Sequence, residues 1–254
     1  GEWARVWPLS WLIKSLGAYF IRRTARTALY RKVLARYVQM ATVGGVNQAF
    51  YPEGGLSLTG KLRPPKMGLL SYLVEGFDPD EGRDVVFVPV AINYDRVLED
   101  RVLIAADQRG DRRFGARISV VVGFILRKLW QRLTFQETRF GTAAVAFGTP
   151  LSLRASGQGA EINALSVELM ARIETAMPVL TVPLVCQALL QKDGLSQEAL
   201  MDAVGKMMGQ IPQANHIFDM DALEMEVTRG VQSLADRDIV VLKNDAWTIA
   251  EGET

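Results

Sequence analysis

The order of apolar and polar positions predicts strands that alternate with helices over residues 1–155. The clearest strand is Val85–Ile92, an uncharged, β-branched run typical of a strand buried on both faces. Further strands are expected at Asn47–Tyr51 and Phe140–Phe147, and helices at 24–40, with Thr24 as N-cap, and at Lys66–Glu75. This alternation indicates an α/β fold, with a largely parallel sheet flanked by helices.

The pattern changes after residue 155, where amphipathic helices follow one another. Helices are expected at Glu161–Met177, Val182–Gln191, Ser196–Met208 and Met220–Asp236, and a terminal hairpin at Arg237–Val241 and Ala246–Ala250. We therefore predict two parts, an α/β domain over 1–155 and a mainly helical region over 156–254. Helices followed by a hairpin resemble the outline of a winged helix.

The charge is distributed unevenly along the 254 residues, although the net charge is only +1. Residues 1–68 carry 11 Lys and Arg against 2 Asp and Glu, a net charge of +9, whereas residues 193–254 carry 4 against 12, a net charge of −8. The basic first part indicates contact with phosphate, an anionic lipid surface or nucleic acid, or else a solvated face balanced by the acidic tail. The acidic tail argues against a winged helix that binds nucleic acid.

The scarcity of cysteine and histidine excludes several kinds of site. The single cysteine, Cys186, cannot form a disulfide within the chain. Because His216 is the single histidine, we expect neither a Ser-His-Asp triad nor a zinc cluster. We expect no metal site. No segment has the roughly 20 apolar residues that spanning a bilayer requires.

Three short blocks place charged or conformationally unusual residues at the ends of apolar runs. The block Gly17–Arg23 ends in Arg22 and Arg23, two guanidinium groups that could hold a phosphate or lie at the surface. In Glu53–Lys61 the glycines let backbone N–H groups approach a ligand, Ser57 and Thr59 carry hydroxyls, and Lys61 adds a positive charge. The block is alternatively a glycine-rich turn that Glu53 ties down. In the third block, Pro89 marks an edge, a bulge or a close approach of ligand within its strand.

In this order the blocks resemble those of the bacterial membrane-bound glycerol-3-phosphate acyltransferase family, within the superfamily of glycerolipid and lysophospholipid acyltransferases. Gly17–Arg23 is similar to the GxxFIRR block, Glu53–Lys61 to EGxRSxTGK, Val88–Glu99 to VPVxIxYxxxxE, and Phe147–Leu151 to FGxPxxL. The resemblance implies transfer of a fatty acyl group to glycerol 3-phosphate, giving lysophosphatidic acid for phospholipid biosynthesis. The substrate-binding residues that it implies are Tyr19, Phe20, Ile21, Arg22, Arg23, Glu53, Gly54, Gly55, Ser57, Thr59, Lys61 and Pro89.

Two departures from the family pattern change what is expected of this chain. The HxxxxD pair, whose histidine acts as general base, normally precedes the GxxFIRR block, but only 16 residues precede Gly17 and none is histidine. His216 and Asp221 have the HxxxxD spacing in the wrong place, so we interpret them as coincidence and His216 as structural. We therefore expect a fragment that holds no catalytic residue and is inactive alone. Leu56 replaces the arginine of EGxRS, so a phosphate contact is lost or supplied by Arg22, Arg23 or Lys61.

The resemblance also implies the partners of the parent protein. These are glycerol 3-phosphate, an acyl thioester donor (acyl-CoA or acyl carrier protein) and a membrane surface, with no cofactor and no nucleic acid. The implied location is the cytoplasmic face of the bacterial inner membrane. Two other functions stay open: an acyltransferase of the same superfamily that uses a different acceptor, and a non-catalytic module that binds anionic lipid.

Overall fold

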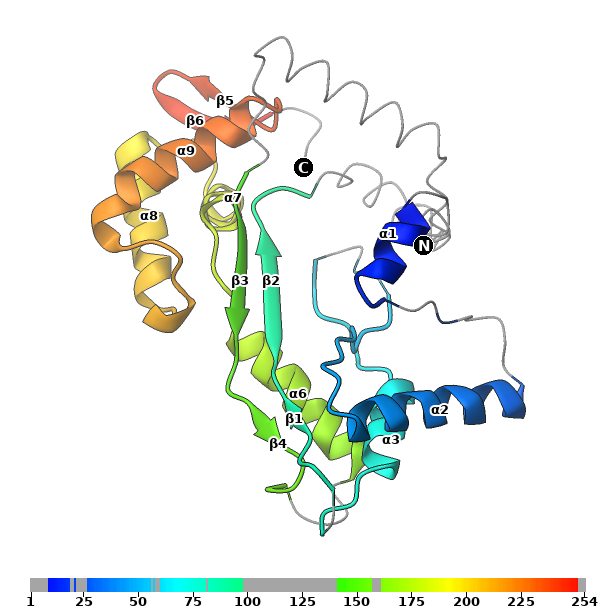
Figure 1. Cartoon of the computed structure of the whole chain (residues 1–254). Helices are drawn as coiled ribbons and strands as arrows, with labels where there is room; N and C mark the ends of the chain where they lie inside the picture. Colours follow the sequence, from blue (N-terminus) through cyan, green and yellow to red (C-terminus); the bar gives the residue numbers. More distant parts are fainter. Residues whose placement is uncertain are drawn as a thin grey trace.

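A long, two-stranded ribbon runs through the centre of the computed structural model, with helices at both of its ends (Figure 1). The structure describes residues 9–18, 21, 27–55, 57, 60–80, 82–97, 141–156 and 161–250. In Figure 1, α2 and α3 lie near one end of the ribbon, and α7, α8 and α9 lie toward the other. The mixture of helices and strands confirms the α/β class.

The ribbon consists of antiparallel strands, so the expected parallel pairing is wrong for the strands that the structure describes. Here β1 (Val86–Phe87) pairs with β4 (Leu151–Ser152), and β2 (Val90–Tyr94) pairs with β3 (Ala143–Phe147). The apolar run had indicated burial on both faces, but only one face is covered. Ala91 is buried, whereas Val90 and Ile92 are each 40% exposed. Exposure of one face is typical of antiparallel sheets.

Pro89 divides the predicted strand Val85–Ile92 into β1 and β2. Phe87 pairs with Leu151 and Val90 pairs with Phe147, so two residues of one strand lie opposite three of the other, as in a β-bulge. Proline has no N–H to donate, but the carbonyl oxygen of Pro89 accepts a hydrogen bond from the N–H of Gly148 at 2.8 Å. The bulge is one of the outcomes expected for Pro89.

The helices before the ribbon are α1 (Leu9–Ser15), α2 (Ala28–Val43) and α3 (Gly68–Glu75). Helix α2 is capped by Thr27, whose hydroxyl accepts a hydrogen bond from the N–H of Tyr30, and not by Thr24 as expected. Residues 47–51 form no strand, contrary to expectation. Instead, the amide of Gln48 bonds back to Thr42 of α2 at 2.8 Å, so this segment follows the helix and joins no sheet.

Two hydrophobic clusters form the core. The first joins α2, α3, the β1–β4 pair and α6 (Ile162–Thr175), and includes Val38, Leu70, Phe87 and Leu165. The second lies within residues 179–249. It is built from α7 (Thr181–Gln191), α8 (Gln197–Gly209), α9 (Leu223–Ala235), β5 (Val240–Lys243) and β6 (Ala246–Ile249). The short helices η2 (Gln213–Asn215) and η3 (Met220–Ala222) lie between α8 and α9 in the sequence. A domain boundary at residue 155 stays a prediction.

The C-terminal region has the expected helices and terminal hairpin. The Ser196 hydroxyl caps α8 by accepting a hydrogen bond from the N–H of Ala199 at 3.2 Å. Strands β5 and β6 are antiparallel, and Asn244 and Asp245 between them have φ of 50° and 59°, as a type I′ turn requires. A winged-helix assignment stays a prediction. Across the described part of the chain, no helix is both long and apolar enough to cross a membrane.

Candidate functional site

Residues 52–66 form a loop that returns to its own starting point before α3. We call it the basic loop, because it carries Lys61, Arg63 and Lys66 against the single acid Glu53, a net charge of +2. The N–H of Lys66 donates to the carbonyl of Pro52 at 2.8 Å, which joins the two ends of the loop. The Ser57 hydroxyl donates to the carbonyl of Lys61 at 2.7 Å. These bonds hold three cations on a short stretch of chain.

Glu53 ties two parts of the basic loop together. Its Oε2 accepts a hydrogen bond from the backbone N–H of Arg63 at 2.9 Å. The Glu53 side chain is half-buried, as is that of Arg63, whereas Lys61 and Lys66 are exposed. A carboxylate in this position fixes the backbone from which Arg63 extends.

Two glycines leave room for basic side chains to lie close to the backbone of the loop. Gly54 has φ of +62°, and a Cβ there would lie 2.8 Å from Cδ of Lys66. A Cβ at Gly55 would lie 3.2 Å from Nη1 of Arg63. Only glycine combines a positive φ with such close approach at low cost. Gly54 is therefore favoured by its positive φ, and both glycines leave room for a basic side chain close to the backbone.

The structure brings five of the predicted binding residues together in the basic loop: Glu53, Gly54, Gly55, Ser57 and Lys61. Of the remaining predicted residues, Ile21 is half-buried. Pro89 is buried in the ribbon, and its Cβ lies 3.2 Å from the position of a Cβ at Gly148. Tyr19, Phe20, Arg22, Arg23 and Thr59, together with Leu56, lie outside the described residues. The binding roles of all twelve stay predictions.

Arg63 and Lys66 are residues of the loop that the sequence analysis missed. They follow the recognised block in the run Lys61-Leu62-Arg63-Pro64-Pro65-Lys66. Alternation of basic residues with proline was the available signal, because proline stiffens the chain and so fixes where the cations lie. Their proximity to Gly54 and Gly55 depends on the return of the loop.

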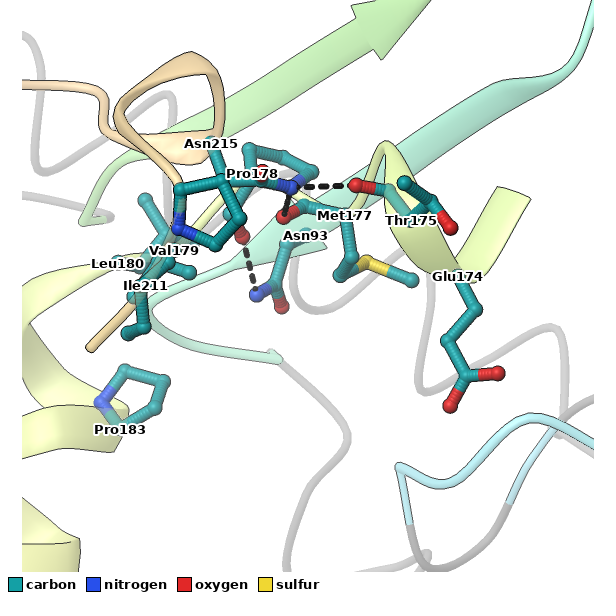
Figure 2. A pocket seen from close by; sticks show the side chains of 11 residues that line it. Asn93, Glu174, Thr175, Met177, Pro178, Val179, Leu180, Pro183, Ile211 and Asn215 are labelled. Atoms are coloured by element: carbon teal, nitrogen blue, oxygen red, sulfur yellow. Dashed lines mark hydrogen bonds between the residues drawn. The ribbon is translucent and has the colours of Figure 1, made fainter. Parts of the chain in front are cut away.

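A cavity of about 440 Å³ lies away from the basic loop, where the end of β2 meets the C-terminal region (Figure 2). Figure 2 shows Asn93 and Asn215 reaching the chain between α6 and α7. Asn93 Nδ2 donates to the carbonyl of Pro178 at 2.9 Å, and Asn215 Nδ2 donates to the carbonyls of Thr175 and Met177 at 2.6 and 2.8 Å. Both amide groups donate to backbone carbonyls, so this region forms a contact between the ribbon and the C-terminal helices.

Asp95 strengthens the same contact between the ribbon and the C-terminal helices. Its carboxylate accepts hydrogen bonds from the N–H groups of Thr142, at 3.2 Å, and Val182, at 3.4 Å. Val182 lies in the first turn of α7, whose N-cap residue Leu180 provides no side-chain bond. A carboxylate at a helix N-terminus also interacts favourably with the helix dipole. Asp95 therefore connects β2, the start of β3 and α7.

His216 makes contacts that suit a structural role. Its Nε2 lies 3.1 Å from the carbonyl oxygens of both Met208 and Ile211, at the end of α8. Carbonyl oxygens only accept hydrogen bonds, so this nitrogen carries the hydrogen and donates it. This side chain therefore holds residue 216 against the end of α8. Within the described residues, no group of three His, Cys, Asp or Glu side chains could hold a metal ion.

Among the described residues, Asp84 and Cys186 have side chains with shifted pKa values. A hydrogen bond from the Ser152 hydroxyl to Asp84, at 2.6 Å, lowers the pKa of that carboxyl, and the N–H of Arg154 adds a second bond at 3.0 Å. Burial raises the pKa of the Cys186 thiol. Asp84 joins the segment before β1 to the end of β4, whereas the neutral Cys186 thiol packs against the second core cluster.

Comparison with known proteins finds two families that match successive parts of the chain. Residues 1–93 match the family described as acyltransferase, and residues 127–250 match the glycerol-3-phosphate acyltransferase C-terminal region. A protein of Mycobacterium tuberculosis named as an acyltransferase, plsB1, is 33% identical over 82% of this chain. Proteins named glycerol-3-phosphate acyltransferase are 30% identical in Aeromonas hydrophila, over 85% of the chain, and 28% identical in Pseudoalteromonas atlantica, over 78%.

These relatives are much longer than the matched region. The match covers 34% of the Mycobacterium protein, 29% of the Aeromonas protein and 26% of the Pseudoalteromonas protein. The chain therefore spans about a third, or less, of the length of the curated relatives that it matches.

Proposed function

Since this chain belongs to the glycerol-3-phosphate acyltransferase family, we propose that it forms part of an enzyme that acylates the first hydroxyl of glycerol 3-phosphate. The donor is a fatty acyl thioester, acyl-CoA or acyl carrier protein, and the product is lysophosphatidic acid. The observation that carries the proposal is the basic loop, which carries three cations, two of them packed close to its glycine pair. Such a loop suits the phosphate of the acceptor.

In this reaction the acceptor oxygen attacks the thioester carbonyl carbon, the C–S bond breaks, and the hydroxyl proton passes to the leaving thiolate. The part of the enzyme described here binds and orients the acceptor. The cations of the basic loop hold the phosphate, and Glu53 keeps the loop closed through the N–H of Arg63. Fixing the phosphate fixes the distance of the first hydroxyl from it, and such positioning accounts for much of the rate of a two-substrate reaction.

We further propose that the enzyme works at the cytoplasmic face of a bacterial inner membrane. The net charge of +9 over residues 1–68 supports contact with an anionic lipid surface. The product carries one acyl chain and a phosphate, so it is amphiphilic and enters the lipid directly. The acidic C-terminal residues would then face away from the lipid.

The test is an acyl-transfer assay with the full-length protein and labelled glycerol 3-phosphate. Acyl-CoA and acyl carrier protein are supplied separately as donors, and lysophosphatidic acid is offered as an alternative acceptor. We expect one-step formation of labelled lysophosphatidic acid, and binding to vesicles that contain phosphatidylglycerol. Turnover of lysophosphatidic acid alone would instead assign a different acceptor. Binding to vesicles without any turnover would indicate a non-catalytic lipid-binding module.

A further inference from the structure

We propose that Arg63 binds the phosphate of the acceptor and supplies the guanidinium that the family pattern places at position 56, where this chain has Leu56. The inference rests on the proposed function, and it assigns a binding residue that lies outside the recognised EGxRSxTGK block. Its basis is a return of the loop that brings residue 63 beside residue 55.

The guanidinium of Arg63 lies over the backbone just before position 56. Nη1 is 3.2 Å from the place where a Cβ on Gly55 would be, although Arg63 and Gly55 are eight positions apart in sequence. An arginine at position 56 would start from the residue next to Gly55. The positive charge of Arg63 thus lies against Gly55, the residue that precedes position 56 in the sequence.

The backbone of Arg63 is held on both sides. Its N–H is bonded to the carboxylate of Glu53 at 2.9 Å. After it come Pro64 and Pro65, whose rings fix φ, and then Lys66, whose N–H is bonded to Pro52 at 2.8 Å. A side chain that leaves a fixed backbone loses less conformational freedom on binding, so it holds a ligand more tightly.

The chemistry of arginine fits phosphate better than that of the neighbouring lysines. A guanidinium presents five N–H donors in a planar fork and can bond two phosphate oxygens at once, whereas an ammonium acts as a point charge. Arg63 is half-buried, while Lys61 and Lys66 are exposed. Partial burial strengthens a charge-assisted bond, because less water screens it.

A role of Arg63 in balancing the charge of Glu53 and a role in binding phosphate predict different kinetics. The hydrogen bond to Glu53 uses the backbone N–H of residue 63, which any residue except proline retains. Replacing the Arg63 side chain therefore leaves this hydrogen bond intact. A purely structural side chain would affect thermal stability, whereas a phosphate ligand affects the KM for glycerol 3-phosphate.

The experiment compares Arg63→Ala, Arg63→Lys and the double variant Leu56→Arg/Arg63→Ala in the full-length enzyme. Loss of a hydrogen bond to a charged group predicts a KM for glycerol 3-phosphate raised about 10- to 100-fold in Arg63→Ala, with the KM for the acyl donor unchanged. Arg63→Lys should be intermediate, and Leu56→Arg should restore the KM in the double variant. Arg83→Ala is the matched control, because the Arg83 guanidinium packs against Gly45 in another turn.

A KM for Arg63→Ala within twofold of wild type, or no rescue by Leu56→Arg, would overturn the inference. Direct titration of glycerol 3-phosphate, which requires no turnover, separates the inference from the proposed function. A protein that binds glycerol 3-phosphate through Arg63 but does not acylate it contradicts the proposed function alone. Equal affinity of the wild type and Arg63→Ala, or no binding by the wild type, contradicts the inference.

Discussion

The carboxylate of Glu53 and the backbone N–H of Arg63, ten residues apart in sequence, are joined by a hydrogen bond of 2.9 Å. This bond closes the middle of the basic loop, while the bond between Pro52 and Lys66 closes its ends. Glu53 therefore has a structural role in addition to any contact with substrate. The two roles can be separated by substitutions that keep or remove the acceptor oxygen.

We expect Glu53→Gln to keep the melting temperature of the wild type and to lose most of its kcat with glycerol 3-phosphate. The amide oxygen of glutamine still accepts the bond from Arg63, but the substitution removes the negative charge, which a role of Glu53 in orienting the acceptor hydroxyls of the full-length enzyme would require. Glu53→Ala removes the acceptor and should lower both kcat and the melting temperature. Near-normal kcat in Glu53→Gln would leave Glu53 with the structural role alone.

Gly54→Ala should destabilise the protein by about 1–3 kcal/mol, because φ is +62° and the new Cβ would meet the Lys66 side chain. Gly60→Ala, with φ of +75° but open space around it, should show the backbone strain alone. Gly68→Ala is the control, since it lies in the first turn of α3 and nothing is within 4 Å of its Cβ position. Urea titrations compare the three. A loss of stability in Gly54→Ala no larger than that in Gly60→Ala would contradict the packing described for Lys66.

His216→Ala should lower stability by about 1–3 kcal/mol, because the carbonyls of Met208 and Ile211 lose their donor. In the full-length enzyme, kcat/KM measured well below the melting temperature should stay at the wild-type value. Asp221→Ala, on an exposed residue of η3, should change neither quantity. Loss of activity in both variants would instead identify His216 and Asp221 as an HxxxxD pair.

Asp84→Asn should lower the melting temperature at pH 7 and have little effect in acid. The hydrogen bond from Ser152 lowers the pKa of Asp84 below the usual value of 3.8, so the folded state favours the ionised carboxylate. The contribution of Asp84 to the free energy of unfolding is complete above pH 3.8 and disappears as the pH falls through the lowered pKa. Melting curves from pH 7 to pH 2 should therefore converge. Asp80→Asn, at an exposed site nearby, controls for the loss of charge, and a constant difference across the range would contradict this role of Asp84.

Local features of the fold could be predicted where one residue type determines the geometry. The helix expected at Ser196–Met208 corresponds to α8, which Ser196 caps, and the expected terminal hairpin corresponds to β5 and β6. The cap of α2 was placed at Thr24 instead of Thr27. Both threonines precede the same apolar pattern, and only the backbone shows which hydroxyl reaches a free N–H.

Features that depend on a distant partner could not be predicted in the same way. The apolar run Val85–Ile92 indicates burial but does not identify its neighbouring strand, so the antiparallel pairing with 143–152 was missed. Arg63 was missed for a similar reason. Its position beside Gly55 follows from the return of the loop, which Glu53 and Pro64 help to set, and no spacing rule describes that return.

The pairing of β2 with β3 has a consequence for the variation of this chain among its relatives. Tyr94 lies opposite Ala143, and the N–H of Asp95 donates to the carbonyl of Thr142 at 2.9 Å, so the residues on either side of the segment 96–141 are held next to each other. A segment with adjoining ends can gain or lose residues without altering the register of the strands. Each doubling of its length costs only about 0.6 kcal/mol in closure entropy. The segment 96–141 is therefore a place where evolution can insert or delete residues at low cost to the fold.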